Sequence, residues 1–281
     1  MSKLTHNIYG KRDVRLTKVK RGPDRHELIE IAVGISLMGD FESTYLTGDN
    51  SKVVATDTMR NTVYALAADH PIDSIEAFAL HLADHFTSRN AHVSDAIVSV
   101  AQDRWLRIDT PGAGPHPHAF VAGGDEKRET NVQAGRLRRV ESSITGLDVL
   151  KTTDSAFTGF IRDEFTTLPE TSDRIFATRV AATWTYLKDD GTDYNRCYAA
   201  IRAALIDTFA AHKSESVQQT LYAMGDAALG ACRDINRIRI SMPNRHRIPF
   251  DLSKLGKPTR NEIFVPTAEP YGAISGEISR D

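Results

Sequence analysis

Alternating hydrophobic and polar positions near the start of the chain predict a β-hairpin. Residues 26–38 place every second side chain on one strand face, namely Ile29, Ile31, Val33, Ile35 and Leu37. Residues 7–20 alternate less regularly around Val14 and Leu16. The turn signal RGPD lies between the two segments, so we expect them to pair as antiparallel strands.

Helical spacing follows the hairpin. Apolar residues recur every three or four positions in residues 58–70 and 74–89, and Asp73-Ser74 offers a cap for the second helix. Strand-like segments come next, at residues 96–108, 118–123 and 131–144. The first half of the chain therefore predicts two strands, two helices and further strands.

The second half repeats this order without a residue-level repeat. Strands are predicted at 146–155, 173–187 and 235–243, and helices at 195–212 and 217–232. Hairpin-paired strands with helices on one face indicate an α+β fold rather than a doubly wound sheet. We expect the boundary near residues 136–143, which gives domains 1–140 and 141–281.

Composition and charge are those of an ordinary globular protein. The 281 residues are 41% hydrophobic and 26% charged, with a formal net charge of −2. This charge gives no reason to expect a nucleic-acid partner or an anionic membrane surface, and no apolar run approaches a membrane span. The N-terminus lacks an apolar signal region and GEISRD is not a peroxisomal Ser-Lys-Leu address, so we expect a cytoplasmic protein.

Motifs for metals and common cofactors are missing from the sequence. His81 and His85 lie in HLADH rather than HExxH, and His116 and His118 form only a short pair. Cys197 and Cys232 are far apart without a CxxC pair, so reduced, buried thiols are favoured over a disulfide or metal site. GxGxxG, GxxxxGK[ST] and GxSxG are also absent from the sequence. We therefore expect no metal and no cofactor.

The stretch VVATDTMRNTVY, residues 53–64, raises a question at Thr56-Asp57. These two residues stand where an apolar strand-like run gives way to a helical pattern. One interpretation is a helix N-cap, because both side chains accept hydrogen bonds from first-turn amides. The other is a ligand site, because a helix N-terminus favours anions. The stretch alone favours the cap.

A longer pattern runs from Leu147 to Arg174, LDVLKTTDSAFTGFIRDEFTTLPETSDR. Physical reasoning alone would assign its aromatic residues to the core and Arg174 to the surface. The pattern nevertheless resembles the signature of the urate oxidase family, including Phe157, Phe160, Phe165 and Leu168. Further blocks resemble that family in the same order along nearly the whole chain: YGKRDVRL, VVATDTMRNTVY, SVQQTLYAMG, MPNRHRIPFDL and NEIFVPTAEPYG. Thr158 and Arg245 depart from the family pattern, at positions that are not catalytic in the family.

The resemblance implies two tandem tunnelling-fold (T-fold) domains, each an antiparallel four-stranded sheet with two helices on one face. It also implies a homotetramer in which each active site lies between two chains. One chain would supply Lys11, Thr56 and Asp57. Its partner would supply Phe157, Arg174, Val217, Gln218, Asn244 and His246.

The implied reaction converts urate, O2 and water to 5-hydroxyisourate and hydrogen peroxide without a metal or flavin. Asp57, Phe157, Arg174, Val217 and Gln218 would bind the purine together with Thr56 and Asn244. Stacking on Phe157, a planar fork from Arg174 and the amide of Gln218 suit a flat, polar anion. Thr56 and Asn244 would hold oxygen and then water. Lys11, Thr56 and His246 would form a catalytic proton relay, with Lys11 acting as base in its neutral form.

Two other functions stay open on the sequence. Another T-fold enzyme acting on purines or pterins would need a zinc set, and Cys197 and Cys232 with His81, His85 or His116 are too scattered to support one. A non-catalytic purine-binding protein of the same fold would be expected to have lost Lys11, Thr56 or His246, and all three are present.

Overall fold

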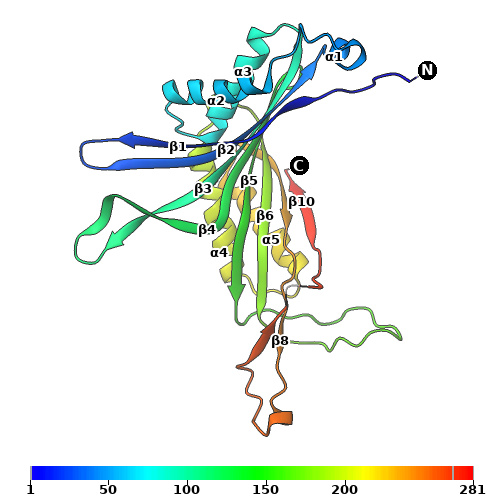
Figure 1. Ribbon diagram of the computed structural model, residues 1–281. Helices are drawn as coiled ribbons and strands as arrows, with labels where there is room; N and C mark the ends of the chain where they lie inside the picture. Colours follow the sequence, from blue (N-terminus) through cyan, green and yellow to red (C-terminus); the bar gives the residue numbers. More distant parts are fainter. Residues whose placement is uncertain (1, 268, 281) are drawn as a thin grey trace. The chain divides into compact units, whose positions relative to one another are not determined.

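The computed structural model describes residues 2–267 and 269–280. The chain divides into two compact units, residues 1–143 with 185–195 and residues 144–184 with 196–281. Both are built from strands and helices, and the α+β class expected from the sequence is confirmed (Figure 1). The domain boundary expected between residues 140 and 141 stays a prediction. No helix among the described residues is long and apolar enough to cross a membrane.

The sheet of the first unit contains four strands in the neighbour order β1-β2-β3-β4. Their bounds are β1 Tyr9–Arg21, β2 His26–Gly39, β3 Val93–Thr110 and β4 Gly114–Gly135. β1 and β2 pair antiparallel as predicted, with Val14 opposite Val33. Ile31, Val33, Ile35 and Leu37 on β2 are fully buried. The period-two pattern therefore identified the core face of this hairpin correctly.

The helices of the first unit are α1 Glu42–Thr47, α2 Thr56–Asp69 and α3 Ile75–Arg89. Figure 1 shows α2 and α3 together on one side of the strands. The predicted cap of α3 is confirmed, because Ser74 Oγ accepts a hydrogen bond from the amide of Ala77 at 3.2 Å. α3 buries its apolar stripe, which contains Ile75, Phe78, Ala79, Leu82, Ala83 and Phe86.

The strands before the boundary differ from the prediction. Residues 118–123 are not a separate strand but part of β4. Residues 131–144 contain the end of β4, a turn and the start of β5, Arg139–Lys151. The turn begins behind Gly135, whose positive φ of 135° is accessible to glycine. A single glycine within a long polar strand gave too weak a signal for this break.

The second unit contains strands in the neighbour order β5-β6-β7-β10. β6 spans Phe176–Tyr186, β7 Ile235–Ser241 and β10 Ser275–Ser279, and the helices are α4 Tyr194–Ala211 and α5 Val217–Ala231. A small hairpin pairs β8 Arg247–Pro249 with β9 Phe264–Pro266, and a 3-10 turn covers Ser253–Leu255. Gly225 lets α5 approach β10 closely, because a Cβ there would lie 2.5 Å from Ile278 Cδ1.

A buried ion pair joins α3 to the sheet of the first unit. Glu76 is completely buried, and its carboxylate accepts hydrogen bonds from Arg128 Nε at 3.2 Å and Nη2 at 2.6 Å. Ser142 Oγ donates a third hydrogen bond to the same carboxylate. Glu76 also lies in the first turn of its helix, where the macrodipole favours a negative charge. Loss of Glu76 would leave the Arg128 guanidinium charged and largely buried.

We predict that Glu76→Ala lowers the free energy of unfolding by about 3–5 kcal/mol, because breaking a buried pair leaves an uncompensated charge. Glu27→Ala is the matched control, since Glu27 pairs with Arg25 and Arg107 but its side chain is 51% exposed. Its effect should stay below about 1 kcal/mol. Urea denaturation of both variants measures the difference. Equal losses of stability would show that the Glu76 pair contributes no more than a surface pair.

Candidate active site

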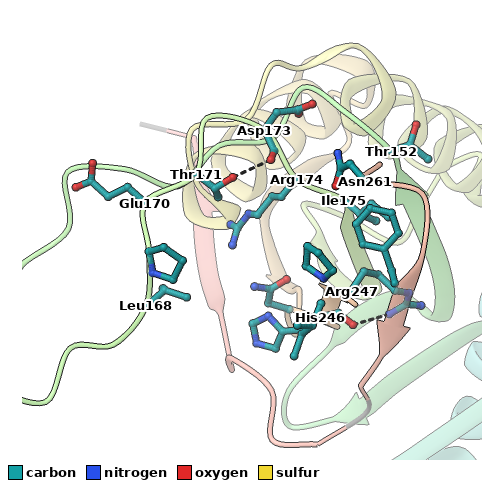
Figure 2. Close-up of a pocket in the computed structure, with 15 residues that line it drawn as sticks. Thr152, Leu168, Glu170, Thr171, Asp173, Arg174, Ile175, His246, Arg247 and Asn261 are labelled. Carbon is teal, nitrogen blue, oxygen red and sulfur yellow. Dashed lines mark hydrogen bonds between the residues drawn. The ribbon is translucent and has the colours of Figure 1, made fainter. Parts of the chain in front are cut away.

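A cavity of about 530 Å³ opens in the second unit between the segment after β5 and the β8–β9 hairpin. Three of the predicted site residues line it, namely Arg174, Asn244 and His246. Figure 2 shows Arg174 and His246 entering this space from different segments. The volume is within the range of small-molecule pockets. The structure therefore brings Arg174 close to Asn244 and His246, although Arg174 and His246 are 72 positions apart in the sequence (174 to 246).

Arg174 supplies an unpaired positive charge to this cavity. Its guanidinium is half-buried and makes no hydrogen bond or ion pair with any residue in the described part of the chain. Burial lowers the pKa of Arg174 below its usual range. A buried cation without a carboxylate is costly unless an anion binds it. Arg174 is consequently a contact for a negatively charged ligand, in a cavity that Glu170, Asp173 and Arg247 also line.

The segment carrying Asn244 and His246 is fixed by its backbone and by a neighbouring arginine. The amide of Asn244 donates to Gly272 O at 2.8 Å, and the amide of Arg245 donates to Ala177 O at 2.9 Å. The His246 carbonyl accepts from Thr267 N and from Arg247 Nη1, both at 3.1 Å. The side-chain amide of Asn244 and the ring of His246 have no hydrogen-bond partner among the described residues, so both are available to a ligand.

Arg245 is held by a carboxylate that the sequence analysis missed. Asp148 Oδ1 accepts from Arg245 Nη1 at 3.0 Å and from Arg179 Nε at 2.9 Å. The Arg179 hydrogen bond, assisted by the charges of Arg179, Arg245 and Arg247, lowers the pKa of Asp148. A polar residue within the alternating run LDVLK was the available signal. Asp148 anchors the segment rather than facing the cavity.

Phe157 lies next to Arg174 and is locked by its backbone. Its amide donates to Thr171 O at 2.8 Å, and its carbonyl accepts from Thr171 N at 3.1 Å. The Phe157 ring stacks on Phe160 with centroids 4.9 Å apart, and the Arg174 guanidinium carbon is 5.3 Å from the Phe157 centroid. Phe160 therefore covers one face of the ring that was expected to stack on the substrate, and the Arg174 guanidinium also lies over this ring.

Val217 and Gln218 begin α5, as predicted. The N-cap is Ser216, whose Oγ accepts from the Gln219 amide at 3.1 Å, while Gln219 Oε1 accepts from the Glu215 amide at 2.8 Å. The first helical hydrogen bond runs from Thr220 N to Ser216 O. The amides of Val217 and Gln218 precede this bond and stay free of helical partners. Val217 is buried and Gln218 is exposed, so the polar side chain is accessible.

The backbone connects the start of α5 to Phe157. The amide of Ala156 donates to Ser214 O at 2.7 Å, and the amide of Ser214 donates to Asp154 O at 2.9 Å. Phe157 and Ser214 therefore flank one short paired segment. Phe157, Val217 and Gln218 do not line the cavity itself, but this pairing fixes them relative to its rim.

Lys11 lies on β1 in the first unit, opposite Ile35 on β2. Gly10 beside it approaches β2 so closely that a Cβ there would lie 1.8 Å from Ile35 O. The register shifts between Lys11 and Val14, and Asp13 within this bulge has a positive φ of 58°. A bulge of this kind redirects neighbouring side chains. Lys11 is half-buried.

Thr56 and Asp57 are not the N-cap of α2, and that interpretation of the sequence is wrong. The N-cap is Ala55, and no side chain caps the helix. Thr56 and Asp57 are the first two helical residues, both exposed. Asp57 binds Asn61 Nδ2 at 3.0 Å and Arg60 Nη2 at 2.7 Å, whereas the Thr56 hydroxyl has no partner in the described residues. The first amides of this helix have no helical partner, an arrangement that can bind an anion.

Tyr9 connects this helix start to the strand that carries Lys11. Its hydroxyl accepts from the Val54 amide at 2.9 Å and donates to the Val54 carbonyl at 3.2 Å. Val54 precedes Thr56 by two residues, and Tyr9 precedes Lys11 by two. The first unit therefore holds Lys11, Thr56 and Asp57 on one set of connected elements. The pattern YGKRDVRL in the sequence did not predict that Tyr9 would bind the segment before α2.

Other cavity-lining residues escaped the sequence analysis. Thr152, Arg247 and Phe264 contribute side chains to the cavity wall. Arg247 and Phe264 come from the β8–β9 hairpin, whose strands are three residues each. Strands this short show no measurable alternation, so the hairpin could not be predicted from spacing.

The short histidine pair and the two cysteines differ in their suitability as metal ligands. His116 and His118 have ring centroids 4.6 Å apart, but among the described residues they belong to no group of ligands that could hold a metal ion. Cys197 and Cys232, described above as scattered, lie close together with a 2.8 Å distance between their sulfur atoms. With Asp234 they form a group whose ligand atoms lie within 4.8 Å of one another.

Comparison with known proteins gives one consistent family. A family model described as Uricase matches residues 7–133 and 140–275. A uricase from Arthrobacter globiformis is 41% identical over 279 residues, covering 99% of this chain and 90% of that protein. A uricase from Aspergillus flavus is 37% identical over 296 residues, covering 100% of this chain and 98% of that protein.

Solved structures agree with this result. The crystal structure of the Arthrobacter globiformis uricase superposes with a TM-score of 0.94 at 41% identity, covering 100% of this chain and 96% of that chain. A urate oxidase from Bacillus sp. TB-90 has a TM-score of 0.85 at 24% identity, which shows a shared fold alone. These matches confirm the expected T-fold, and they show that the chain belongs to the uricase family of enzymes.

Proposed function

We propose that this chain is a urate oxidase that converts urate, O2 and water to 5-hydroxyisourate and hydrogen peroxide. The observation that carries the proposal is Arg174, an unpaired and half-buried guanidinium at a cavity of about 530 Å³. A urate anion would supply the missing negative charge. The family assignment favours neither a metal-dependent T-fold hydrolase nor a non-catalytic purine-binding protein.

Most of the proposed substrate contacts come from residues of the second unit. The planar fork of Arg174 can contact a carbonyl oxygen and the adjacent ring nitrogen together. Phe157 offers the ring face not covered by Phe160. The free amides of Val217 and Gln218 and the exposed Gln218 side chain offer donors and an acceptor to the remaining polar edge. The positive end of the α5 dipole also favours the anion.

Proton transfer and oxygen binding involve residues of both units. Lys11, Thr56 and His246 form the proposed relay, in which Lys11 accepts a proton through the Thr56 hydroxyl. Asn244 and Thr56 hold oxygen and afterwards the attacking water. Asp57 contributes its free helix-start amide to the substrate. Urate deprotonated in this way is electron-rich enough to reduce oxygen directly, and we propose that no metal or flavin takes part.

We further propose that the protein assembles as a homotetramer with shared sites. Lys11, Thr56 and Asp57 from one chain would complete the site formed by Arg174 and His246 of another. The proposal rests on family membership and on the placement of the two residue groups in separate units. Each chain would then take part in two sites.

Purified protein should remove the near-ultraviolet absorbance of urate in air, with hydrogen peroxide as a product. Dialysis against a strong chelator should leave the rate unchanged, since the proposed residues bind and deprotonate the substrate without a metal. The measurement combines the absorbance assay with elemental analysis. Activity that disappears on chelation and returns with copper, iron or zinc would overturn the cofactor-free mechanism.

Variants should separate anion binding from proton transfer. Arg174→Ala removes a charge-assisted bidentate contact of about 2–4 kcal/mol, so KM should rise roughly 30- to 1000-fold. Lys11→Ala should mainly lower kcat and alter the acidic side of the pH profile, where a neutral amine is needed. Thr56→Ala should resemble Lys11→Ala, and the double variant should be little worse than either.

Arg233→Ala provides the control for these measurements, because Arg233 is exposed and lies outside the proposed site. Its kinetics should match those of the unmodified protein. Steady-state rates across pH distinguish the roles. A Lys11→Ala protein with unchanged kcat and pH profile would remove lysine from the relay.

Shared sites predict complementation between inactive variants. Thr56→Ala and Arg174→Ala chains, unfolded together and reassembled, should recover activity that neither shows when it is refolded alone. The recovery arises because some sites would combine an intact Thr56 from one chain with an intact Arg174 from another. If the mixture stays inactive while both variants assemble normally, sites are not shared between chains.

A further inference from the structure

The only two cysteines of the chain meet in the second unit. Cys197 lies near the start of α4, and Cys232 immediately follows α5. Their exposed fractions are 1% and 4%, and their sulfur atoms are 2.8 Å apart. A disulfide bond of about 2.05 Å would require these atoms to approach by less than about 1 Å. The fold has thus placed a dithiol in bonding reach without a sequence motif.

A carboxylate lies next to the dithiol and can accept its protons. The Cys232 thiol donates to Cys197 Sγ, and the Cys197 thiol donates to Asp234 Oδ2 at 3.4 Å. The Asp234 side chain is 27% exposed and pairs with Arg196 Nη2 at 2.9 Å. A proton leaving Cys197 therefore has a route through Asp234 to solvent. Because a thiol must lose its proton as it attacks peroxide, oxidation of this buried thiol requires such a proton acceptor.

Two thiolates and a carboxylate are also ligands for a soft divalent metal. Two observations favour a disulfide instead. The Arg196 guanidinium already binds Asp234, and it places a positive charge where a metal would need its third ligand. Burial and the neighbouring Cys232 and Asp234 raise the pKa of the Cys197 thiol, which opposes a buried pair of thiolates. A disulfide carries no charge and fits the buried setting without a counterion.

We propose that Cys197 and Cys232 form a peroxide-sensitive dithiol that closes to an intramolecular disulfide. The source of the peroxide rests on the proposed function, because urate oxidation releases hydrogen peroxide beside this protein. The dithiol chemistry itself requires only the peroxide. Cys197 reacts first, since Asp234 accepts its proton.

The oxidation proceeds in two balanced steps. The Cys197 sulfur attacks one peroxide oxygen while its proton passes to Asp234, so that an S–O bond forms, the O–O bond breaks and hydroxide leaves to become water. The Cys232 sulfur then attacks the sulfenic sulfur of Cys197 and loses its proton to the leaving hydroxide, so that the S–S bond forms and a second water is released. The two thiols lose two electrons and two protons, and the peroxide is reduced to two water molecules.

The bond would connect the start of α4 to the end of α5, away from the proposed substrate contacts. Val217 and Gln218 lie at the opposite end of α5, whose 15 residues span about 22 Å. Closing the loop from residue 197 to residue 232 restricts the unfolded chain. Oxidation should therefore stabilise the protein against heat and leave kcat unchanged.

The first test treats fully reduced protein with hydrogen peroxide in the absence of urate. Thiols titrated in denaturant should fall from two per chain to none, and a reductant should restore both. One peptide species should contain residues 197 and 232, and the chain should stay monomeric on a denaturing gel without reductant. The melting temperature should rise by roughly 5–10 °C.

Variants test the roles of Cys232 and Asp234 in the oxidation. Cys232→Ser should form no disulfide, should carry an oxidised Cys197 after peroxide and should show no rise in melting temperature. Asp234→Asn removes the proton acceptor of the Cys197 thiol, so disulfide formation should slow at least about tenfold while reaching the same end product. Faster formation would show that the carboxylate acts only by raising the pKa of the Cys197 thiol, and it would overturn the proton route. Unchanged thiol loss in Asp234→Asn would overturn the proton route. Thiols that persist in the native protein, or crosslinks between chains, would overturn the disulfide.

A second test uses the reaction as the source of peroxide. Reduced protein turning over urate in air should form the disulfide, and added catalase should prevent it. Disulfide formation with added peroxide but not during turnover would count against peroxide release by the proposed reaction, and it would support the dithiol chemistry. A further measurement tests metal binding by adding zinc alone to the reduced protein. Stoichiometric zinc binding that is lost in Cys232→Ser would assign Cys197, Cys232 and Asp234 to a metal site and would overturn the proposal.

Discussion

The backbone of residues 154–157 is the constraint on which the candidate site depends. It forms hydrogen bonds to Ser214 on one side and to Thr171 on the other. Because these bonds join main-chain atoms, they position Phe157, the segment leading to Arg174 and the start of α5 independently of side-chain identity. An irregular segment outside the helices acquires a fixed geometry in this way, and these backbone groups are satisfied.

Given that geometry, the charge of the site is the main energetic cost. Arg174 has no carboxylate partner in the described residues, although Asp173 precedes it directly and lines the same cavity, and Asp148 pairs with Arg179 and Arg245. The second unit therefore neutralises the arginines that hold the Asn244 segment and leaves Arg174 unneutralised. Free amides at the start of α5 add partial positive charge in the same unit. A site of this kind gives up folding stability to gain affinity for an anion.

Sequence reasoning succeeded where a periodic pattern reports burial directly. Ile31, Val33, Ile35 and Leu37 alternate because one face of β2 is buried, so the hairpin and its core face were predictable. The Ser74 cap followed from local chemistry. Residues 118–135 and the β8–β9 hairpin were not predictable, because a long polar strand and three-residue strands carry little periodicity. The proposed site residues rest on resemblance at family spacing and stay a prediction.

Other features depend on contacts that sequence position does not encode. Thr56 has the chemistry of a helix N-cap, but Ala55 is the N-cap and Thr56 is the first helical residue. The Thr56 hydroxyl therefore has no partner in the described residues. Whether Arg174 is paired depends on which carboxylates the fold brings near it. Cys197 and Cys232 appear scattered in the chain, yet α4 and α5 bring their sulfur atoms together. Packing of α5 thus creates two separate chemical settings, exposed amides and Gln218 at its start and a buried dithiol at its end. The helix keeps Cys232 about 22 Å from Val217 and Gln218, so a redox change at one end can alter stability without altering the other.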